Sequence, residues 1–212
     1  MRAVLALITS LILCSTVPQA RAQVADPTAV LAGDRWSYDV KDGVTGDLRQ
    51  AITIVVVDVT DKEVNTRISV AGKDRPRTFI FAHDWGRIDD SVWQFQPAEI
   101  GLKTPLSLGK EWRAETGAKN LQTGSTLRGS GVAKVIGEEK ITTAAGTFDT
   151  FKVQTVVRQV NNNDQTKAST STSVFWFAPA VNRWVKKTHE TRFEGRLRDS
   201  VVEELTSYSR KP

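Results

Sequence analysis

The chain has 212 residues, of which 40% are hydrophobic and 25% charged, and its 29 Lys and Arg against 24 Asp and Glu give a net charge of +5. This length fits one domain or a closely joined pair, and the apolar fraction excludes a disordered chain. One Cys and two His exclude a disulfide-bonded scaffold, a thiolate metal cluster and a His-rich metal centre.

The N-terminus has the three parts of a secretory signal peptide. Arg2 gives a positive start, residues 3–14 form an apolar stretch, and Ala20 and Ala22 are the small residues that precede a cleavage site. The stretch is shorter than the ~18 residues of a membrane-spanning helix, so we expect cleavage after Ala22. Removal of residues 1–22 leaves 190 residues (212 − 22) and lowers the net charge from +5 to +3, because Arg2 and Arg21 are lost.

The predicted mature chain, residues 23–212, contains no Cys. Such a chain suits an oxidising compartment because it cannot mispair, and we expect a periplasmic or secreted protein. Cys14 follows Leu13 rather than a small residue, so we interpret it as part of the signal peptide and not as a lipidation site. The small positive charge does not indicate the concentrated basic face of a nucleic-acid-binding protein. We therefore predict no nucleic-acid partner, and no transmembrane span in the mature chain.

The predicted mature chain begins with one short helical turn at 26–33. Asp26 suits the N-cap, Pro27 the first helical position and Gly33 the position just past the end. Beyond it, apolar and polar residues alternate, and Val, Thr, Ile and aromatic residues are frequent, as is typical of β-strands with one buried face. We predict about ten strands, at 35–41, 48–60, 63–71, 77–83, 86–95, 127–136, 139–144, 148–160, 167–178, 183–193 and 199–208, where 127–144 is either two strands or one strand bent near Gly137.

Short links join most of the predicted strands, which favours an antiparallel meander. Residues 96–125 are the exception, since Pro97, Pro105 and several glycines interrupt them. We interpret this segment as an irregular connection with one short strand at 106–112 and as a candidate lid. Many long strands in one sheet must curl or close to hide their edges. The predicted fold is therefore all-β, with one domain over 23–212 whose antiparallel meander curls into an open or closed barrel.

Four motifs cover most of the predicted mature chain. They are GDRWSY at 33–38, LGKEW at 108–112, GEE with AGTFDTFKV between 137 and 153, and FWFAP followed by RWVK between 175 and 186. Together they resemble a family of uncharacterised exported bacterial envelope proteins. The resemblance implies an exported, β-rich protein similar to the open barrels of lipoprotein carriers, and it implies no catalytic residue. A likeness of fold does not by itself identify a site.

Aromatic residues are the main candidates for a binding site. All six Trp and eight Phe lie in the predicted mature chain. They can fill the core of a curled sheet, line a cavity inside it, or form an exposed patch for a partner. The candidates for lining a ligand cavity are Trp36, Tyr38, Trp93, Trp112, Phe151, Trp176 and Trp184.

The sequence offers little for catalysis. His83 and Asp84 are neighbours at a predicted hairpin end, so their side chains point apart, and His189 lies among charged residues on a predicted solvated strand face. No nucleophile-elbow, Walker, zincin or dinucleotide motif is present. Basic residues near the C-terminus, including Arg183, alternate with acidic ones. This pattern indicates a salt-bridged surface or, alternatively, a docking face for anionic lipid head groups or a cell-wall polymer.

These observations predict an exported binding or accessory protein of the bacterial envelope, without enzymatic activity, cofactor or metal. Its expected ligand is an apolar, lipid-like molecule inside the curled sheet, and its expected partner is a lipid or another envelope component. One alternative is an interaction module with a filled core. The other is an envelope hydrolase whose polar groups converge around His83 or His189. The oligomeric state is not indicated.

Overall fold

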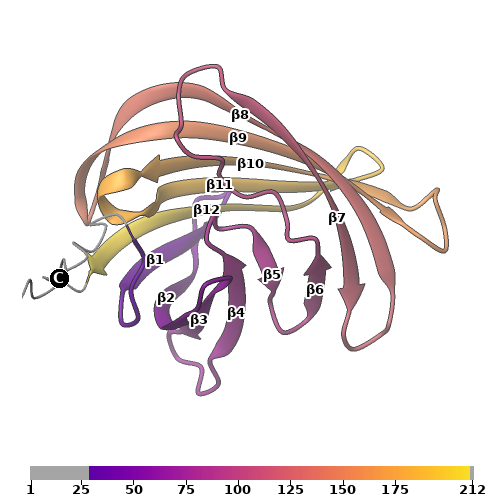
Figure 1. Cartoon of the computed structure of the whole chain (residues 1–212), viewed down its shortest axis with the longest axis horizontal. Coiled ribbons are helices and arrows are strands. Elements are labelled where there is room, and N and C mark those ends of the chain that lie inside the picture. Colours follow the sequence, from indigo (N-terminus) through magenta and orange to yellow (C-terminus); the bar gives the residue numbers. More distant parts are fainter. Residues whose placement is uncertain (1–28, 211–212) are drawn as a thin grey trace, which may run out of the picture.

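The computed structural model describes residues 29–210, whose strands form a closed antiparallel barrel of twelve strands (Figure 1). Each strand pairs with its neighbours in the chain, and β1 (Arg35–Asp42) pairs with β12 (Arg196–Ser209) to close the sheet. The predicted all-β meander is confirmed, and the barrel is closed. Between residues 29 and 210 the only helix is the short 3-10 helix η1 (Pro179–Val181).

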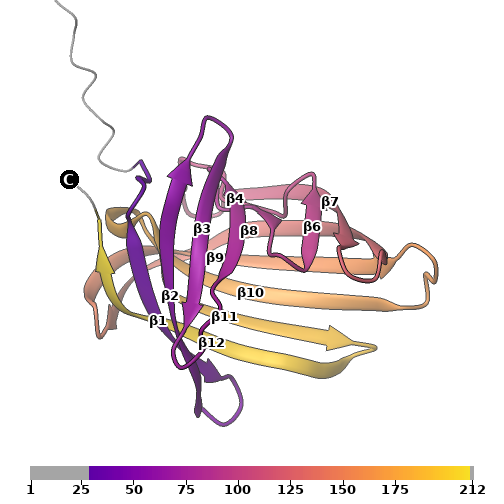
Figure 2. The same cartoon turned by 90° about the horizontal axis from the view of Figure 1, so that it is seen from below.

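The two halves of the chain form two sides of the barrel that cross at a steep angle (Figure 2). The N-terminal side begins with β1 and continues with β2 (Leu48–Val59), β3 (Glu63–Val70), β4 (Arg77–Ala82), β5 (Arg87–Asp89) and β6 (Trp93–Gln96). The other side arches over it. Besides β12 its strands are β7 (Glu111–Asn120), β8 (Thr126–Thr143), β9 (Gly146–Asn161), β10 (Ala168–Ala178) and β11 (Arg183–Phe193). This side includes the longest strands, β8 and β9.

The structure decides one alternative that the prediction left open and corrects the strand boundaries at two other places. The run 127–144 is the single strand β8, and a register shift between Val135 and Gly137 marks a bulge where the bend is predicted. The predicted strand 86–95 is divided into β5 and β6, with a turn at Ser91, whose φ is 69°. The short strand predicted at 106–112 is wrong in its bounds, because the strand of the segment 96–125 is β7 at Glu111–Asn120. The irregular parts of the segment are therefore 97–110 and the turn 121–125.

The predicted N-terminal features lie largely before the described residues. The signal peptide, residues 1–22, and residues 26–28 of the expected helical turn are outside them. The remainder of that turn is a bend and a hydrogen-bonded turn, in which the Asp34 amide donates to the Leu31 carbonyl at 3.0 Å. Gly33 has a φ of 94°, which only glycine adopts without strain.

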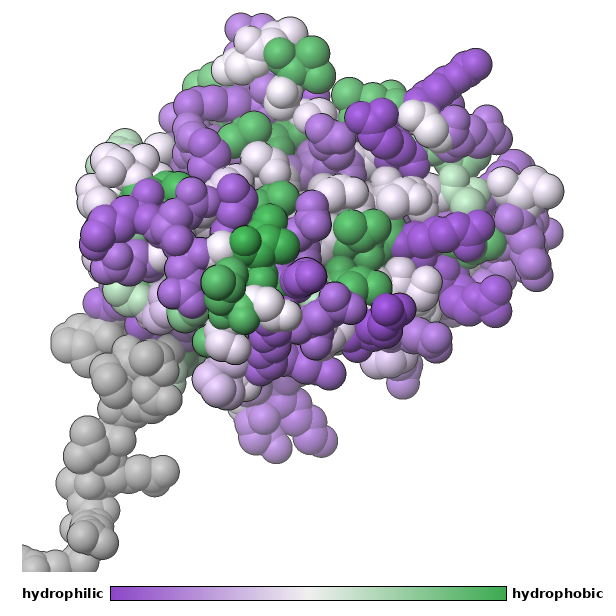
Figure 3. Space-filling model, turned by 90° about the horizontal axis from the view of Figure 1, so that it is seen from above, coloured by the Kyte–Doolittle hydropathy of each residue, from purple (hydrophilic) through white to green (hydrophobic). Residues whose placement is uncertain are grey.

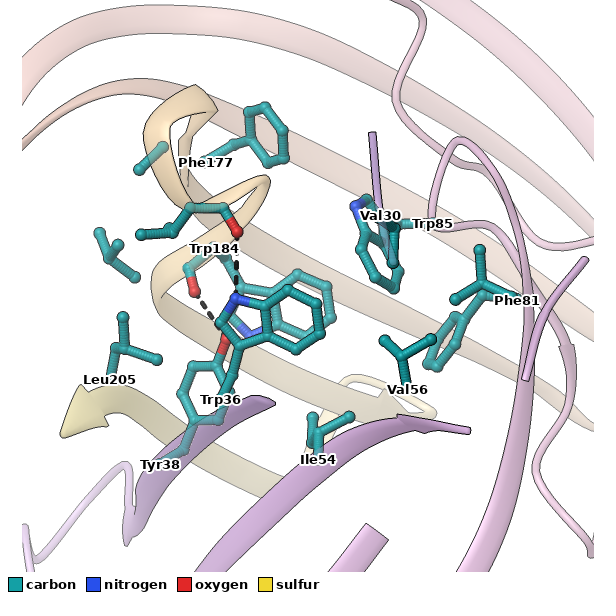
Figure 4. Packing of buried hydrophobic residues seen from close by; sticks show 14 of the residues in the cluster. Val30, Trp36, Tyr38, Ile54, Val56, Phe81, Trp85, Phe177, Trp184 and Leu205 are labelled. Atoms are coloured by element: carbon teal, nitrogen blue, oxygen red, sulfur yellow. Dashed lines mark hydrogen bonds between the residues drawn. The ribbon is translucent and has the colours of Figure 1, made fainter. Parts of the chain in front are cut away.

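The meander places its loops at two opposite ends of the barrel. The first end, which we call the capped end, carries the loops 60–62, 83–86, 97–110 and 144–145 together with η1. The second end, which we call the mouth, carries the hairpin turns 43–47, 71–76, 90–92, 121–125, 162–167 and 194–195. The main hydrophobic cluster, which includes Trp36, Trp85 and Val181, lies at the capped end (Figure 4).

The outer surface is mostly hydrophilic, with separate hydrophobic patches on the face shown in Figure 3. Ile136 and Val156, on two neighbouring strands, are each 40% exposed, which is ordinary for single surface residues. Over residues 29–210 no helix has the length and apolar character needed to cross a membrane.

Candidate ligand cavity

A cavity of about 670 Å³ lies inside the barrel. Its volume is within the range of roughly 300–1,000 Å³ that is typical of ligand pockets. The cavity exists because β7 to β10 turn small side chains inward, and Ala114, Gly131, Thr155 and Ser173 all line it. Closely packed interiors contain few voids larger than a water molecule, so this space is a specific feature of the barrel.

One wall of the cavity is apolar and comes from three adjacent strands. Ile52 and Ile54 lie on β2, Ile68 on β3, and Phe79 and Phe81 on β4. They face one side of the sheet because residues two apart on a strand point in the same direction. The apolar wall continues across the barrel through Val157, Phe175 and Val201.

The capped end closes the cavity with an aromatic cluster (Figure 4). Trp36 and Tyr38 are fully buried, and each donates a hydrogen bond to a backbone carbonyl at the end of η1 or at the start of β11. The Trp36 indole N–H donates to the Val181 carbonyl at 3.0 Å, and the Tyr38 hydroxyl donates to the Trp184 carbonyl at 2.9 Å. Burial raises the pKa of Tyr38 above its usual value, so its hydroxyl stays protonated.

Arg183 is the most unusual residue of this end, because its side chain is completely buried. Its guanidinium carbon lies 4.0 Å from the ring centre of Trp184 and 4.1 Å from that of Trp85. None of its three guanidinium nitrogens has a hydrogen-bond partner among the described residues. Burial lowers the pKa of Arg183, and the ionised carboxylate of Glu203 partly counteracts this effect.

The prediction that Arg183 belongs to a charged surface is wrong, since its side chain is completely buried. The pairing of β10 with β11 shifts register between Trp176 and Phe177, so the simple alternation of β11 fails near Val185. This bulge brings Trp184 to the same side as Lys187 and His189, and Arg183, the first residue of β11 after η1, lines the cavity as well. Sequence alternation alone predicts that two adjacent residues face opposite sides, so it could not find this arrangement.

A partly buried ion pair lies beside the aromatic cluster. The Glu203 carboxylate accepts a hydrogen bond from the Lys187 ammonium at 3.1 Å and another from the Trp184 indole at 3.0 Å. Burial acts to raise the pKa of Glu203, but Lys187 and the two hydrogen bonds outweigh it and keep the pKa below its usual value. Glu203 is therefore ionised and already engaged by Lys187 and Trp184.

The cavity carries an excess of positive charge. Six basic side chains line it, and only two carboxylates, Glu99 and Glu203, do so. Arg87 is paired with Glu99 at 2.9 Å and with Asp90 at 2.9 Å. The other basic residues of the lining lie in two places. Arg183 and Lys187 are on β11, and Lys73, Arg75 and Arg77 are at or near the mouth.

His189 faces the cavity, so the predicted solvated position is wrong. Its Nδ1 lies 2.8 Å from the Ser173 hydroxyl and its Nε2 lies 3.1 Å from the Thr191 hydroxyl. Burial, followed by repulsion from Lys187, lowers its pKa to about 4. An imidazole with so low a pKa is a weak base for activating a serine, and its second nitrogen meets a hydroxyl where catalytic triads place a carboxylate.

The other histidine lies away from the cavity. His83 is exposed in the turn after β4, where its Nε2 lies 2.9 Å from the Thr60 carbonyl oxygen. Among residues 29–210, no three His, Cys, Asp or Glu side chains lie close enough together to hold a metal ion.

We expect stability to fall when the pH decreases from 6.5 to 4 because of His189. The folded protein keeps this imidazole neutral down to a pKa of about 4, whereas in the unfolded chain the imidazole binds the proton near the ordinary histidine pKa of 6.5. The stabilisation is fully present above pH 6.5 and amounts to about 2 kcal/mol after allowance for partial solvent screening. Urea denaturation at a series of pH values measures it. In His189→Gln the loss over this interval should be smaller, and an unchanged slope would contradict the assignment.

The seven aromatic residues that the sequence suggests for lining a cavity lie in different places. Trp184 lies in the cavity wall, while Trp36 and Tyr38 belong to the cluster that closes its end (Figure 4). Trp112 and Phe151 pack in a second cluster near the loop 97–110, where the Trp112 indole donates to the Gly101 carbonyl at 2.9 Å.

The two remaining candidates are outside the cavity lining. Trp176 donates to the Glu139 carboxylate at 2.6 Å, and Trp93 is half-buried on the short strand β6. Residue parity explains the difference for β10, because Phe175 faces the cavity and the adjacent Trp176 faces away from it. The aromatic content of the sequence does not show which residues of β10 face the cavity, and the register of this strand in the barrel determines it.

Solved structures share this fold. A proposed lipoprotein from Parabacteroides distasonis matches with a TM-score of 0.55 and 14% identity, over 85% of this chain and 97% of that chain. A proposed exported protein from Bacteroides fragilis, described as having a YmcC-like fold, matches with a TM-score of 0.56 and 12% identity, over 86% and 98%. The fold is YmcC-like.

The fold of these structures confirms the predicted likeness to β-rich proteins described as exported or as lipoproteins. No protein-family model and no curated protein matches the sequence. The likeness therefore concerns the YmcC-like barrel and assigns no site, so the cavity has to be interpreted from its own residues.

Proposed function

We propose that this chain is an exported protein of the bacterial envelope that binds a lipid-like amphiphile inside its barrel. The observation that carries the proposal is the cavity of about 670 Å³ with an apolar wall and a few polar groups. Such a combination is typical of sites that bury a small ligand and orient it. A filled-core interaction module does not require this volume.

The location proposed for the protein has two independent supports. The N-terminal residues have the order of a secretory signal peptide, and two proteins with the same fold are described as a lipoprotein and an exported protein. An envelope protein meets membrane amphiphiles, which fits a barrel with a cavity and an apolar interior wall.

Burial of an alkyl chain supplies the affinity in this proposal. Each methylene that leaves water contributes about 0.8 kcal/mol, so a chain of ten or more carbons provides several kcal/mol even after the cost of association. Ile52, Ile54, Ile68 and Phe79 form a continuous apolar surface for such a chain.

Native mass spectrometry of gently purified protein and a titration with a polarity-sensitive fluorescent lipid analogue test the proposal. We expect a co-purifying amphiphile or one saturable site for the analogue. A protein that carries no ligand and shows no saturable binding of the analogue would refute it.

A further inference from the structure

The capped end of the cavity contains buried hydrogen-bond donors that the described residues leave without acceptors. They are the three guanidinium nitrogens of Arg183 and the indole nitrogen of Trp85. Both residues line the cavity. Buried polar groups are almost always hydrogen-bonded, and an unpaired buried charge is costly, so four such nitrogens in one place require an explanation.

The surroundings hold the guanidinium firmly in place. Four aromatic rings contribute to this enclosure, and their centres lie 4.0 to 5.3 Å from the Arg183 guanidinium carbon. Trp85 has a φ of 65°, which is strained for a bulky residue, and this backbone conformation turns its ring inward over Arg183. A strained backbone conformation costs free energy and persists only where the surrounding structure enforces it, and such residues cluster at ligand sites.

The aromatic rings satisfy the charge of Arg183 only in part. Cation–π contacts stabilise the face of a guanidinium, but its five N–H groups lie in the plane and need acceptors. Of the two carboxylates that line the cavity, Glu99 is paired with Arg87, and Glu203 is occupied by Lys187 and Trp184. Arg183 is therefore a basic group of the cavity for which no separate carboxylate is left among the lining residues.

We infer that Arg183 is the binding site for the anionic head group of the ligand, and that this group is a carboxylate or phosphate held at the capped end while the alkyl chain extends toward the mouth. The inference rests on the proposed function and specifies its ligand class. A planar guanidinium pairs with carboxylate or phosphate oxygens through parallel charge-assisted hydrogen bonds. The Trp85 indole N–H is a further donor at the same wall.

The orientation follows from where the apolar wall lies relative to Arg183. Phe81 and Ile54 are at the capped end, and Ile52, Ile68 and Val70 follow along the strands toward the mouth. An alkyl chain attached to a head group at Arg183 would lie along these side chains. The opposite orientation would place the chain against the unpartnered donors and leave them unpaired.

Calorimetric titration of the protein at pH 7.5 with dodecanoate and with dodecanol, both below their micellar concentrations, tests the inference. We expect dodecanoate to bind at least ~10-fold more tightly, since one charge-assisted hydrogen bond provides such a factor. Acetate and inorganic phosphate, the free-anion controls, should bind far more weakly than dodecanoate. The fluorescence of Trp85 and Trp184 should change with dodecanoate, because their rings enclose the guanidinium.

Each outcome has a distinct meaning. Equal binding of dodecanoate and dodecanol would overturn the role of Arg183 and leave the proposed function intact. Failure of both to bind would refute the proposed function itself. If acetate or phosphate binds as tightly as dodecanoate, the site is one for a free anion, and the inference that the ligand is an amphiphile is overturned.

Two variants locate the head group. Arg183→Met keeps an extended side chain among the aromatic rings without charge, and it should reduce the preference for dodecanoate to about onefold. Arg75→Met, at the exposed mouth, should retain the preference, and loss of the preference in this variant alone would place the head group at the mouth. If Arg183→Met does not fold, Trp85→Phe removes the indole N–H and keeps an aromatic ring, and an unchanged preference together with unchanged tryptophan fluorescence on binding would overturn the capped-end site.

Discussion

Trp36→Ala is expected to lower the free energy of unfolding by about 4 kcal/mol, because removal of a buried Trp leaves a large void. Trp36 is fully buried, packs edge-on against Trp85 with ring centres 5.7 Å apart, and donates a hydrogen bond to the Val181 carbonyl. The substitution also leaves that carbonyl without its partner. For a domain of this size the loss corresponds to a fall in Tm of about 8–16 °C.

Urea denaturation followed by circular dichroism measures the effect of Trp36→Ala. Val57→Ala is the control on the adjacent strand β2, where the side chain is 51% exposed, and it should change the stability by less than about 0.5 kcal/mol. A loss of less than ~1 kcal/mol for Trp36→Ala would contradict the view that this residue anchors the capped end.

Ala114→Trp is expected to weaken dodecanoate binding by at least ~10-fold, because the ring would occupy the volume in which the alkyl chain lies. Ala114 lies on β7 and lines the cavity, and the adjacent Glu115 is exposed on the outside of the same strand. The cavity of about 670 Å³ provides space for the larger side chain, so the barrel should remain folded.

Glu115→Trp is the matched control for the cavity variant, since it adds the same ring one residue further along the strand and on the outer face. It should bind dodecanoate as the parent protein does. Calorimetry measures both variants, and thermal unfolding confirms that each is folded. Normal binding by Ala114→Trp, or equal weakening by Glu115→Trp, would show that the ligand binds outside the cavity.

Local sequence was sufficient to predict most strands of this barrel. The alternation of Val64, Thr66 and Ile68 with polar neighbours specifies β3, and the apolar run 54–57 specifies the centre of β2. Side-chain alternation has a period of two, so it is visible without knowledge of strand partners. The short strands β5 and β6 were merged in the prediction because a single turn at Ser91 gives only a weak local signal.

The candidate site was harder to predict. The sequence indicates many aromatic residues, yet it does not show which of them share a surface, since that depends on the register between strands. Trp184 lines the cavity and Trp176 does not, although both lie in similar apolar runs. The charged neighbours of Arg183 and His189 in the sequence predict a surface position for both residues, whereas both line the cavity.

By itself the sequence determined the all-β class, the antiparallel order of the strands and the need to curl the sheet, because these follow from local periodicity and short links. Only the tertiary structure decided that the sheet closes, that a cavity remains inside, and that Arg183 lies buried at its capped end. Closure depends on the pairing of β1 with β12, which lie at opposite ends of the chain, and the bulge near Val185 depends on the register between β10 and β11. The physical reason is that burial of a particular side chain is set by its partners across the barrel, which no local pattern specifies.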